Sequence, residues 1–449
     1  MKWFSEKLHF STWRFFAGLI VVLSFSVNIL STVSVYNFSA FQADSEQLVR
    51  NAFDCQNARG AGSHSGLLII HAGEGCGTGM VPYFSQSGGP YWLMGLLYPA
   101  SHGLQRAYVQ LIKTSLAIIS AVMLISMCRK MMGKLEKKYE LLVYVLLALS
   151  PWLVVFSVNL FWLLPLLLTP LWFAWTWYDK LRLKPAVFFV VLGLLFMVKF
   201  LAGYEYASTL AIGTLSPVVW HELHKKRKWR DIVRRCALVL VSAAVGFLCA
   251  FSINLAQAAH ETGGLGKGYR VIYERAKLRT YAAVDPNIGA GIMNQLKLLK
   301  PLDYEFFEWN LHLTNHISAS KTDRVWQNAV VLYQYIAAPA ITTPVAFAFP
   351  YNVIFASTGT FMVVIASICI ARYRKFRKKF AYKEPLLFST LIALVGGFSW
   401  LVVGYGHSFI HTHINSIIFY LPFLPQAYVV IAQELQAKLK RRRHVFKSW

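Results

Sequence analysis

Apolar stretches of about 20 residues recur along the chain, with polar segments between them. A helix needs about 20 apolar residues to cross the hydrocarbon core of a bilayer, so this pattern predicts transmembrane helices. The first stretch, Trp13 to Tyr36, is too long for a signal-peptide core and lacks a small-residue cleavage site before Asp44. The pattern predicts an all-α polytopic membrane protein. About ten spans are expected, near residues 15–36, 106–127, 140–157, 160–178, 185–203, 205–221, 236–256, 350–371, 385–404 and 414–433.

The composition agrees with a membrane protein, since 56% of the residues are hydrophobic and 14% are charged. An average soluble domain has about 25% charged residues. The net charge of +25 is explained by position, because most Lys and Arg fall in segments predicted to face the cytoplasm. This arrangement places both termini in the cytoplasm and favours contact with anionic lipids, and no nucleic-acid motif competes with it. The basic clusters are Arg129 to Lys138, Lys225 to Arg235, Arg372 to Lys383 and Lys438 to Lys447.

Two of the predicted extracytoplasmic segments are long, and they divide the chain. Residues 1–256 form a seven-span module that includes the first outer loop at 37–105. Residues 257–349 form an extracytoplasmic subdomain, and residues 350–449 form a three-span module with a basic cytoplasmic tail. In the first outer loop, the apolar residues between Asp44 and Phe53 are spaced as on a short amphipathic helix.

Cysteines fall on both predicted sides of the membrane. Cys55 and Cys76 share the first outer loop, in an oxidising compartment if the membrane is the bacterial inner membrane, so we predict a disulfide between them. Four further cysteines lie in predicted spans or at their inner ends and are expected to be reduced, namely Cys128, Cys236, Cys249 and Cys369.

Asp44 and Glu46 follow the first predicted span and are the first candidates for catalysis. On an extended strand their side chains would share a face, and on a helix they would diverge by about 200°. We therefore expect only one of them to reach a substrate, with Asp44 preferred because it lies nearer the membrane. The alternative is that either acid caps the helix that follows.

Lys199 is an ionisable residue inside a predicted span, about one turn from its outer end. Intramembrane charges are costly and are usually functional. Here a cation could neutralise a lipid-linked phosphate, while Tyr204 and Tyr206 could hold an apolar group or a sugar. The alternative is a lysine that extends toward the interface or pairs with Glu205. Lys113, near the outer end of the second span, is a weaker case of the same kind.

His407, His411 and His413 lie in the short loop between the ninth and tenth predicted spans. Imidazole can give a phosphate either a hydrogen bond or a positive charge, so phosphate or acceptor binding is one hypothesis. Interfacial histidines without a function are the second, and a metal site is the third. The remaining candidates are polar residues of outer turns and loops, where the arginines could instead form a solvated face, namely Asn159, Trp162, Arg270, Arg275 and Arg279.

This layout resembles the GT-C superfamily of integral membrane glycosyltransferases. Three features carry the resemblance. An acidic pair, Asp44 and Glu46, lies early in a long outer loop after the first span. A seven-span module is followed by a second long outer loop, and the last spans have short connections. The resemblance covers most of the chain in architecture.

The resemblance implies transfer of a sugar from a polyprenyl-phosphate-linked donor to a cell-envelope glycan or lipid acceptor, usually without a metal or other cofactor. An acid of the first outer loop is the general base in such enzymes, which by position implies Asp44, with Glu46 as the substitute. Basic residues at the membrane rim hold the donor phosphate, which by location implies Lys199, His407 and His411. Members with a pyrophosphate-linked donor commonly need a divalent metal, and the Asp-x-Glu form leaves that route open without favouring it.

We therefore expect an enzyme of the bacterial inner membrane whose active site is extracytoplasmic. Its partners would be the lipid-linked donor, the acceptor and membrane lipids. The alternative is a flippase, polymerase or transporter of envelope polysaccharide precursors. A transporter should line a path with polar residues, whereas these spans are largely apolar and their polar groups gather at the predicted outer ends. That distribution favours an enzyme, and a purely structural protein would leave Lys199 and the histidines without a purpose.

Overall fold

The computed structural model describes residues 2–27, 45–59, 67, 69–71, 80–280, 332, 335–336, 339–342, 354–410 and 417–447. This part of the chain is predominantly α-helical, which confirms the predicted all-α class. It also contains two small antiparallel sheets, each of two strands. One pairs β1 (Ile69–His71) with β2 (Met80–Pro82), and the other pairs β3 (Pro339–Thr342) with β4 (Ile354–Ser357).

Within the described ranges, three helices are long and apolar enough to cross a membrane, namely α5 (His102–Met132), α12 (Trp229–Thr262) and α19 (Pro385–Val403). The pair α6 (Lys137–Ala148) and α7 (Pro151–Ser157) meets the same criterion but bends by 60°. Pro151 causes the break, because it has no N–H to donate and it keeps the preceding Ser150 in an extended conformation. Shorter apolar helices cover residues 12–27 of α1 (Lys2–Val27) and α9 (Pro185–Leu201). These helices indicate a membrane protein.

The remaining helices connect or pack against these. They are α3 (Glu46–Arg59), α4 (Gly89–Gly95), α8 (Leu164–Leu181), α10 (Ala207–Gly213), α11 (Leu215–His224), α13 (Leu265–Thr280), α17 (Thr358–Phe376), α18 (Phe380–Lys383), α20 (Tyr405–Ile410), α21 (Ile417–Tyr420) and α22 (Phe423–Lys447). Helix α3 is the short helix that the sequence predicts in the first outer loop. Most of the predicted subdomain at 257–349 lies outside the described residues.

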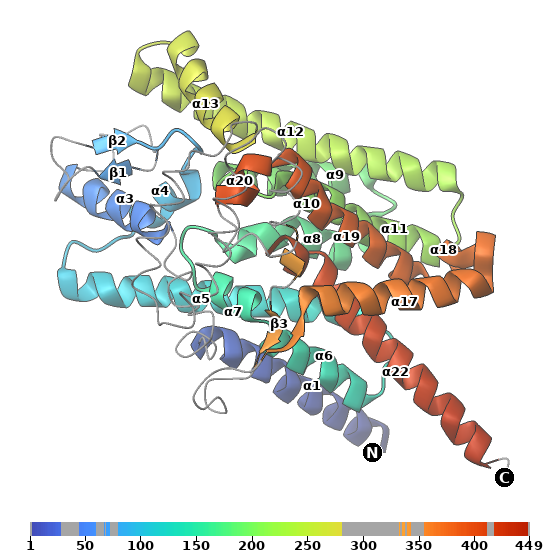
Figure 1. The fold of residues 1–449 in the computed structure, drawn as a ribbon. Coiled ribbons are helices and arrows are strands. Elements are labelled where there is room, and N and C mark those ends of the chain that lie inside the picture. The colour runs from blue at the N-terminus through green and yellow to red at the C-terminus, as the bar shows by residue number, and fades with distance from the viewer. Residues whose placement is uncertain are drawn as a thin grey trace, which may run out of the picture.

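The four basic segments of the sequence gather at one end of the helix bundle. Lys440 of α22 lies 3.2 Å from Glu136, which precedes α6, and an ion pair joins α17 to α22. Tyr382 of α18 donates a hydrogen bond of 2.8 Å to the backbone oxygen of Arg227, which follows α11. Both chain ends and α18 lie at this end in Figure 1, whereas α3, α4 and α13 lie at the other. We call the first the basic end and the second the loop end.

Helices α9 and α12 cross at very short range, which requires glycine. A Cβ atom at Gly246 of α12 would lie 2.6 Å from the carbonyl oxygen of Gly193 and 2.8 Å from the backbone nitrogen of Met197. Ser242, one turn earlier in α12, donates a hydrogen bond of 3.0 Å to the backbone oxygen of Phe189. Lipid offers little hydrophobic drive for helix association, so small residues that permit close packing stabilise such pairs.

We predict that Gly246→Ala lowers the stability of the folded protein by about 1–3 kcal/mol, because the added methyl group pushes α9 and α12 apart. Thermal unfolding in detergent, followed by circular dichroism, would measure the effect. Gly193→Ala is the matched control, since its Cβ would meet no atom closer than 3.5 Å. The control should melt at or above the wild-type temperature. Equal melting temperatures for the two variants would contradict the short crossing.

Candidate functional site

A tight turn between α9 and α10 lies at the loop end and carries two predicted site residues, Tyr204 and Glu205. Gly203 and Tyr206 adopt positive φ values of 146° and 62°, which reverse the chain within four residues. A Cβ atom at Gly203 would collide with the carboxylate of Glu205 and would lie 2.7 Å from Gln86 Oε1. Glycine is therefore required there, and the Glu205 carboxylate lies folded against the turn beside Gln86.

The buried side chain of Lys199 stabilises this turn by hydrogen bonds. Its side chain is 3% exposed, and its ammonium donates hydrogen bonds to the backbone oxygens of Gly203 and Glu205, the latter at 2.6 Å. These carbonyls belong to the turn that follows α9, since the helix ends at Leu201. Lys199 thus interacts with the backbone of Glu205. The structure assigns it a role in holding the turn, and a phosphate contact by Lys199 stays a prediction.

His407 of α20 lies in an enclosure of aromatic rings. Its ring centroid lies 5.5 Å from Trp400, 6.0 Å from Tyr206 and 6.4 Å from Trp162, each in an edge-to-face arrangement. The residue is 2% exposed. The rings come from α19, from the α9–α10 turn and from the α7–α8 turn, so three separate parts of the chain fix the position of the imidazole.

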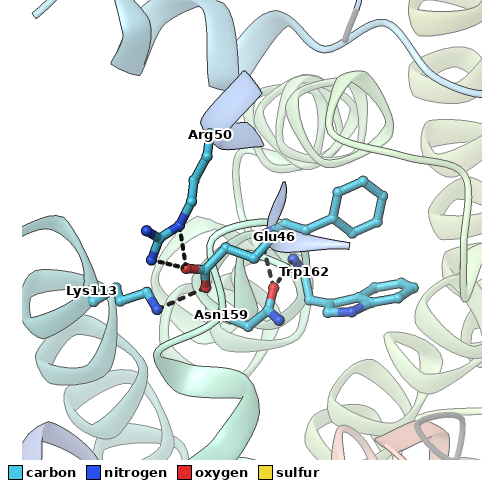
Figure 2. Close-up of polar contacts among 6 residues, drawn as sticks. Glu46, Arg50, Lys113, Asn159 and Trp162 are labelled. Carbon is cyan, nitrogen blue, oxygen red and sulfur yellow. Dashed lines mark hydrogen bonds and ion pairs between the residues drawn. The ribbon is translucent and has the colours of Figure 1, made fainter. Parts of the chain in front are cut away.

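Asn159 holds the α7–α8 turn that carries one of these rings. Its Oδ1 atom accepts hydrogen bonds from the backbone N–H groups of Phe161 (2.8 Å) and Trp162 (2.9 Å), as Figure 2 shows for Trp162. Leu163, which follows Trp162, has a φ of 43°, a conformation that is unfavourable for leucine. The hydrogen bonds from Asn159 help to hold the turn in this conformation. Asn159 is 1% exposed and acts by positioning Trp162.

A cavity of about 250 Å³ lies beside this enclosure and brings four predicted candidates together, namely Tyr204, Glu205, His407 and Arg275 of α13. The rest of the described lining is small or apolar and comes mainly from α12, α13 and α19, namely Ser85, Ala207, Phe247, Phe251, Ile272, Ala276, Thr280, Trp400, Val403 and Gly404. The cavity therefore combines a predominantly apolar wall with a carboxylate, an imidazole and a guanidinium group.

Helix α13 shows which of the loop arginines reaches the cavity. Its lining residues, Ile272, Arg275, Ala276 and Thr280, recur at helical spacing and share one face. Arg270 is about 140° away from Arg275 around the helix and is exposed. The helical period, applied to the sequence, is enough to predict that Arg270 and Arg275 lie on different faces of one helix. The side chain of Arg279, the third candidate, lies outside the described residues.

Glu46, the second acid of the predicted catalytic pair, is the first residue of α3 and is 3% exposed. Its carboxylate lies 2.8 Å from Lys113 Nζ of α5 and 2.7 Å from Arg50 of its own helix (Figure 2). A carboxylate in the first turn also interacts favourably with the helix dipole. The structure thus makes Glu46 an ion-paired anchor between α3 and α5. The pairing of Lys113 with Glu46 was not predicted from the sequence.

Further along α3, Phe53 and Asp54 contact the segment after α4. Phe53 packs against Tyr98 at a ring distance of 5.1 Å, and the Tyr98 hydroxyl lies 3.2 Å from Asp54 Oδ1. Burial and the neighbouring Asp54 carboxylate raise the pKa of Tyr98 to about 12. The phenol therefore stays protonated near neutral pH and can donate this bond.

Several predicted site residues lie outside the described residues, namely Asp44, Cys76, His411 and His413. Cys55 is disulfide-bonded, and Cys128, Cys236, Cys249 and Cys369 are free thiols. The pairing of Cys55 with Cys76 stays a prediction. Within the described part of the chain, no group of three or more His, Cys, Asp or Glu side chains is placed to hold a metal ion.

We predict that Lys113→Met costs about 1–3 kcal/mol of stability, because it leaves the buried Glu46 carboxylate with one charged partner fewer. Chemical unfolding of the single variants and of the double variant Lys113→Met/Glu46→Gln would measure the coupling energy. The double variant should lose less than the sum of the singles.

Arg50→Met provides the matched control, because Arg50 contacts the same carboxylate with a side chain that is 47% exposed. We expect it to cost less than about 1 kcal/mol. If both substitutions cost the same, the pair between α3 and α5 is not the anchor.

No protein-family model, curated protein or solved structure matches this chain. Its function therefore has to be inferred from the chemistry of these residues.

Proposed function

We propose that the protein is a membrane glycosyltransferase of GT-C-like architecture, which transfers a sugar from a polyprenyl-phosphate-linked donor to a cell-envelope glycan or lipid acceptor. The observation that carries this proposal is the cavity at the loop end. Its wall is mainly apolar, and Glu205, Arg275 and His407 also line it. A lipid-linked sugar phosphate has three parts that this lining could bind, namely an apolar chain, an anionic phosphate and a polar sugar.

Each part of the donor has a counterpart in the cavity. Phe247, Phe251 and the other apolar residues would contact the first prenyl units. Arg275 offers a planar guanidinium that can bind two phosphate oxygens at once, and His407 can add a hydrogen bond. The Glu205 carboxylate would accept hydrogen bonds from sugar hydroxyls, and the Tyr204 hydroxyl would donate one to a sugar oxygen.

The proposed reaction exchanges one bond at the anomeric carbon. The bond from this carbon to the phosphate oxygen breaks, and polyprenyl phosphate leaves with the bonding electron pair. Positive charge develops on the sugar while negative charge grows on the leaving phosphate, which cations stabilise. The acceptor oxygen forms the new bond, and its proton passes to a carboxylate. We assign that base to Asp44, because Glu46 already has two cationic partners.

The proposed orientation places the basic end in the cytoplasm and the loop end outside, with ten spans. In this proposal the ten spans would be formed, in order, by the described helices α1, α5, α6–α7, α8, α9, α10–α11, α12, α17, α19 and α22. Gathering of the four basic segments at one end supports this orientation, since cytoplasmic segments carry an excess of Lys and Arg. The cavity would then open at the outer surface, where the lipid-linked donor and the acceptor would meet.

We predict that Arg275→Gln weakens binding of the donor phosphate. Native mass spectrometry of detergent-purified wild-type protein should detect a bound polyprenyl-phosphate species, and this species should fall at least about tenfold in the variant. Lys277→Gln is the matched control, because Lys277 lies on the same helix, carries the same charge and does not line the cavity.

Retention of the lipid by Arg275→Gln, or equal loss from both variants, would contradict the assignment of Arg275. If ordinary phospholipids alone co-purify with the wild type, the glycosyltransferase proposal is wrong, and a transporter of envelope precursors becomes the better hypothesis.

We predict that Asp44→Asn lowers transfer by about 100-fold or more while donor binding is retained, because a general base typically contributes that much. The measurement compares envelope glycans and accumulated lipid-linked sugars in cells that lack the gene and carry either version. Glu46→Gln should instead lower the amount of folded protein, with activity per folded molecule largely kept. Full transfer by Asp44→Asn together with loss by Glu46→Gln, corrected for folded protein, would move the base to Glu46.

A further inference from the structure

A second cavity, of about 380 Å³, lies at the basic end and shares no lining residue with the cavity at the loop end. It is formed where α8 ends, α9 begins, and α11 gives way to α12. Four arginines line it together with two acids, namely Arg182, Arg227, Arg234, Arg235, Glu222 and Asp231. The proposed glycosyl transfer uses none of these residues.

The turn between α11 and α12 fixes one of these arginines in place. Lys226 adopts a positive φ of 53°, and the backbone N–H of Arg227 donates to the backbone oxygen of Glu222 at 3.1 Å. The backbone oxygen of Arg227 accepts the hydrogen bond from Tyr382 described above. Helix α12 then begins at Trp229 and presents its own arginines to the same cavity.

The charges of this cavity do not balance. Glu222 is 1% exposed, accepts a hydrogen bond of 2.8 Å from the Tyr178 hydroxyl and lies 3.9 Å from Arg182. Three other lining arginines, Arg227, Arg234 and Arg235, form no ion pair with any described residue. Asp231 can offset one of them at most, so the cavity keeps an excess of positive charge.

An apolar surface adjoins this cationic cavity. Leu183, which lines it, is 86% exposed, and Val187 and Val190 are exposed on the next turns of α9. Val233 is exposed on the first turns of α12, and Trp229 at the start of that helix is 44% exposed. Trp at such a position is typical of the boundary between headgroups and acyl chains. Lipid tails could therefore extend along α9 and α12 from a headgroup in the cavity.

We infer that this cavity binds the phosphate headgroup of an anionic glycerophospholipid. A topology signal requires only that basic residues lie on one side of the membrane. It does not require four arginines to converge on one cavity below an exposed apolar face. Basic pockets between transmembrane helices are suited to anionic headgroups, and guanidinium groups match phosphate oxygens in geometry. The inference does not depend on the proposed glycosyl transfer.

The test is a lipid titration of the delipidated, detergent-purified full-length protein, read by native mass spectrometry. Phosphatidylglycerol and phosphatidylcholine with identical acyl chains are compared. The wild type should prefer phosphatidylglycerol, and the triple variant Arg227→Gln/Arg234→Gln/Arg235→Gln should lose at least about tenfold of that preference. The control, Arg374→Gln/Lys378→Gln/Lys379→Gln, removes the same charge from exposed residues of the basic end and should keep the preference.

A third variant keeps the test decisive if the glutamine triple does not fold. The variant Arg227→Lys/Arg234→Lys/Arg235→Lys preserves the charge and the topology signal but lacks the guanidinium fork, so it should lose part of the preference. Full retention by this variant, or equal losses in the glutamine triple and the control, would overturn the inference. Displacement of phosphatidylglycerol from the wild type by millimolar inorganic phosphate would also overturn it, because the site would then be one for free phosphate.

Discussion

The need to pair every buried charge within the protein governs this structure, because lipid offers such groups no alternative partner. Arg14 of α1 forms two hydrogen bonds, of 2.7 and 3.0 Å, with the Glu140 carboxylate of α6, which is 3% exposed. The Lys113–Glu46 pair joins α5 to α3 in the same manner. Each of these pairs links elements that are far apart in sequence. Together with the Gly246 crossing, they help to determine which helices are neighbours and where α3 is attached.

The same requirement explains why the two ends of the bundle differ. At the loop end, the ammonium of Lys199 donates hydrogen bonds to backbone oxygens, and Lys113 forms an ion pair with Glu46. These cations therefore stabilise turns and helix contacts, and neither of them lines the loop-end cavity, whose wall is mainly apolar. At the basic end, by contrast, arginines outnumber the acids around them. The two cavities thus differ in charge, with a mainly apolar wall at the loop end and an excess of arginine at the basic end.

Local patterns in the sequence predicted the local structure well. The apolar stretch at 185–203 forms helix α9 (Pro185–Leu201), and the stretch at 385–404 forms α19 (Pro385–Val403), which is long enough to cross a membrane. The break at Pro151 falls inside the stretch 140–157, which the hydrophobic pattern predicts as one span. The Glu46–Arg50 contact follows from i,i+4 spacing, whereas the Lys113 partner could not be predicted, since spacing carries no information on pairs 67 positions apart. The grouping of Tyr204, Glu205 and His407 in one cavity depends on how helices pack, and here too the sequence supplied only the candidates.

The distribution of unpaired positive charge also distinguishes how the two cavities would hold a phosphate. The described lining of the loop-end cavity contains one arginine, Arg275, and no lysine, so most of the binding free energy there must come from burial of an apolar chain. At the basic end, three lining arginines form no ion pair with a described residue, so the attraction for a headgroup would be mainly electrostatic. Interactions between exposed charges weaken within a Debye length of about 8 Å at physiological ionic strength. Salt should therefore affect ligand binding at the basic end much more than at the loop end, where the length of the apolar chain decides affinity.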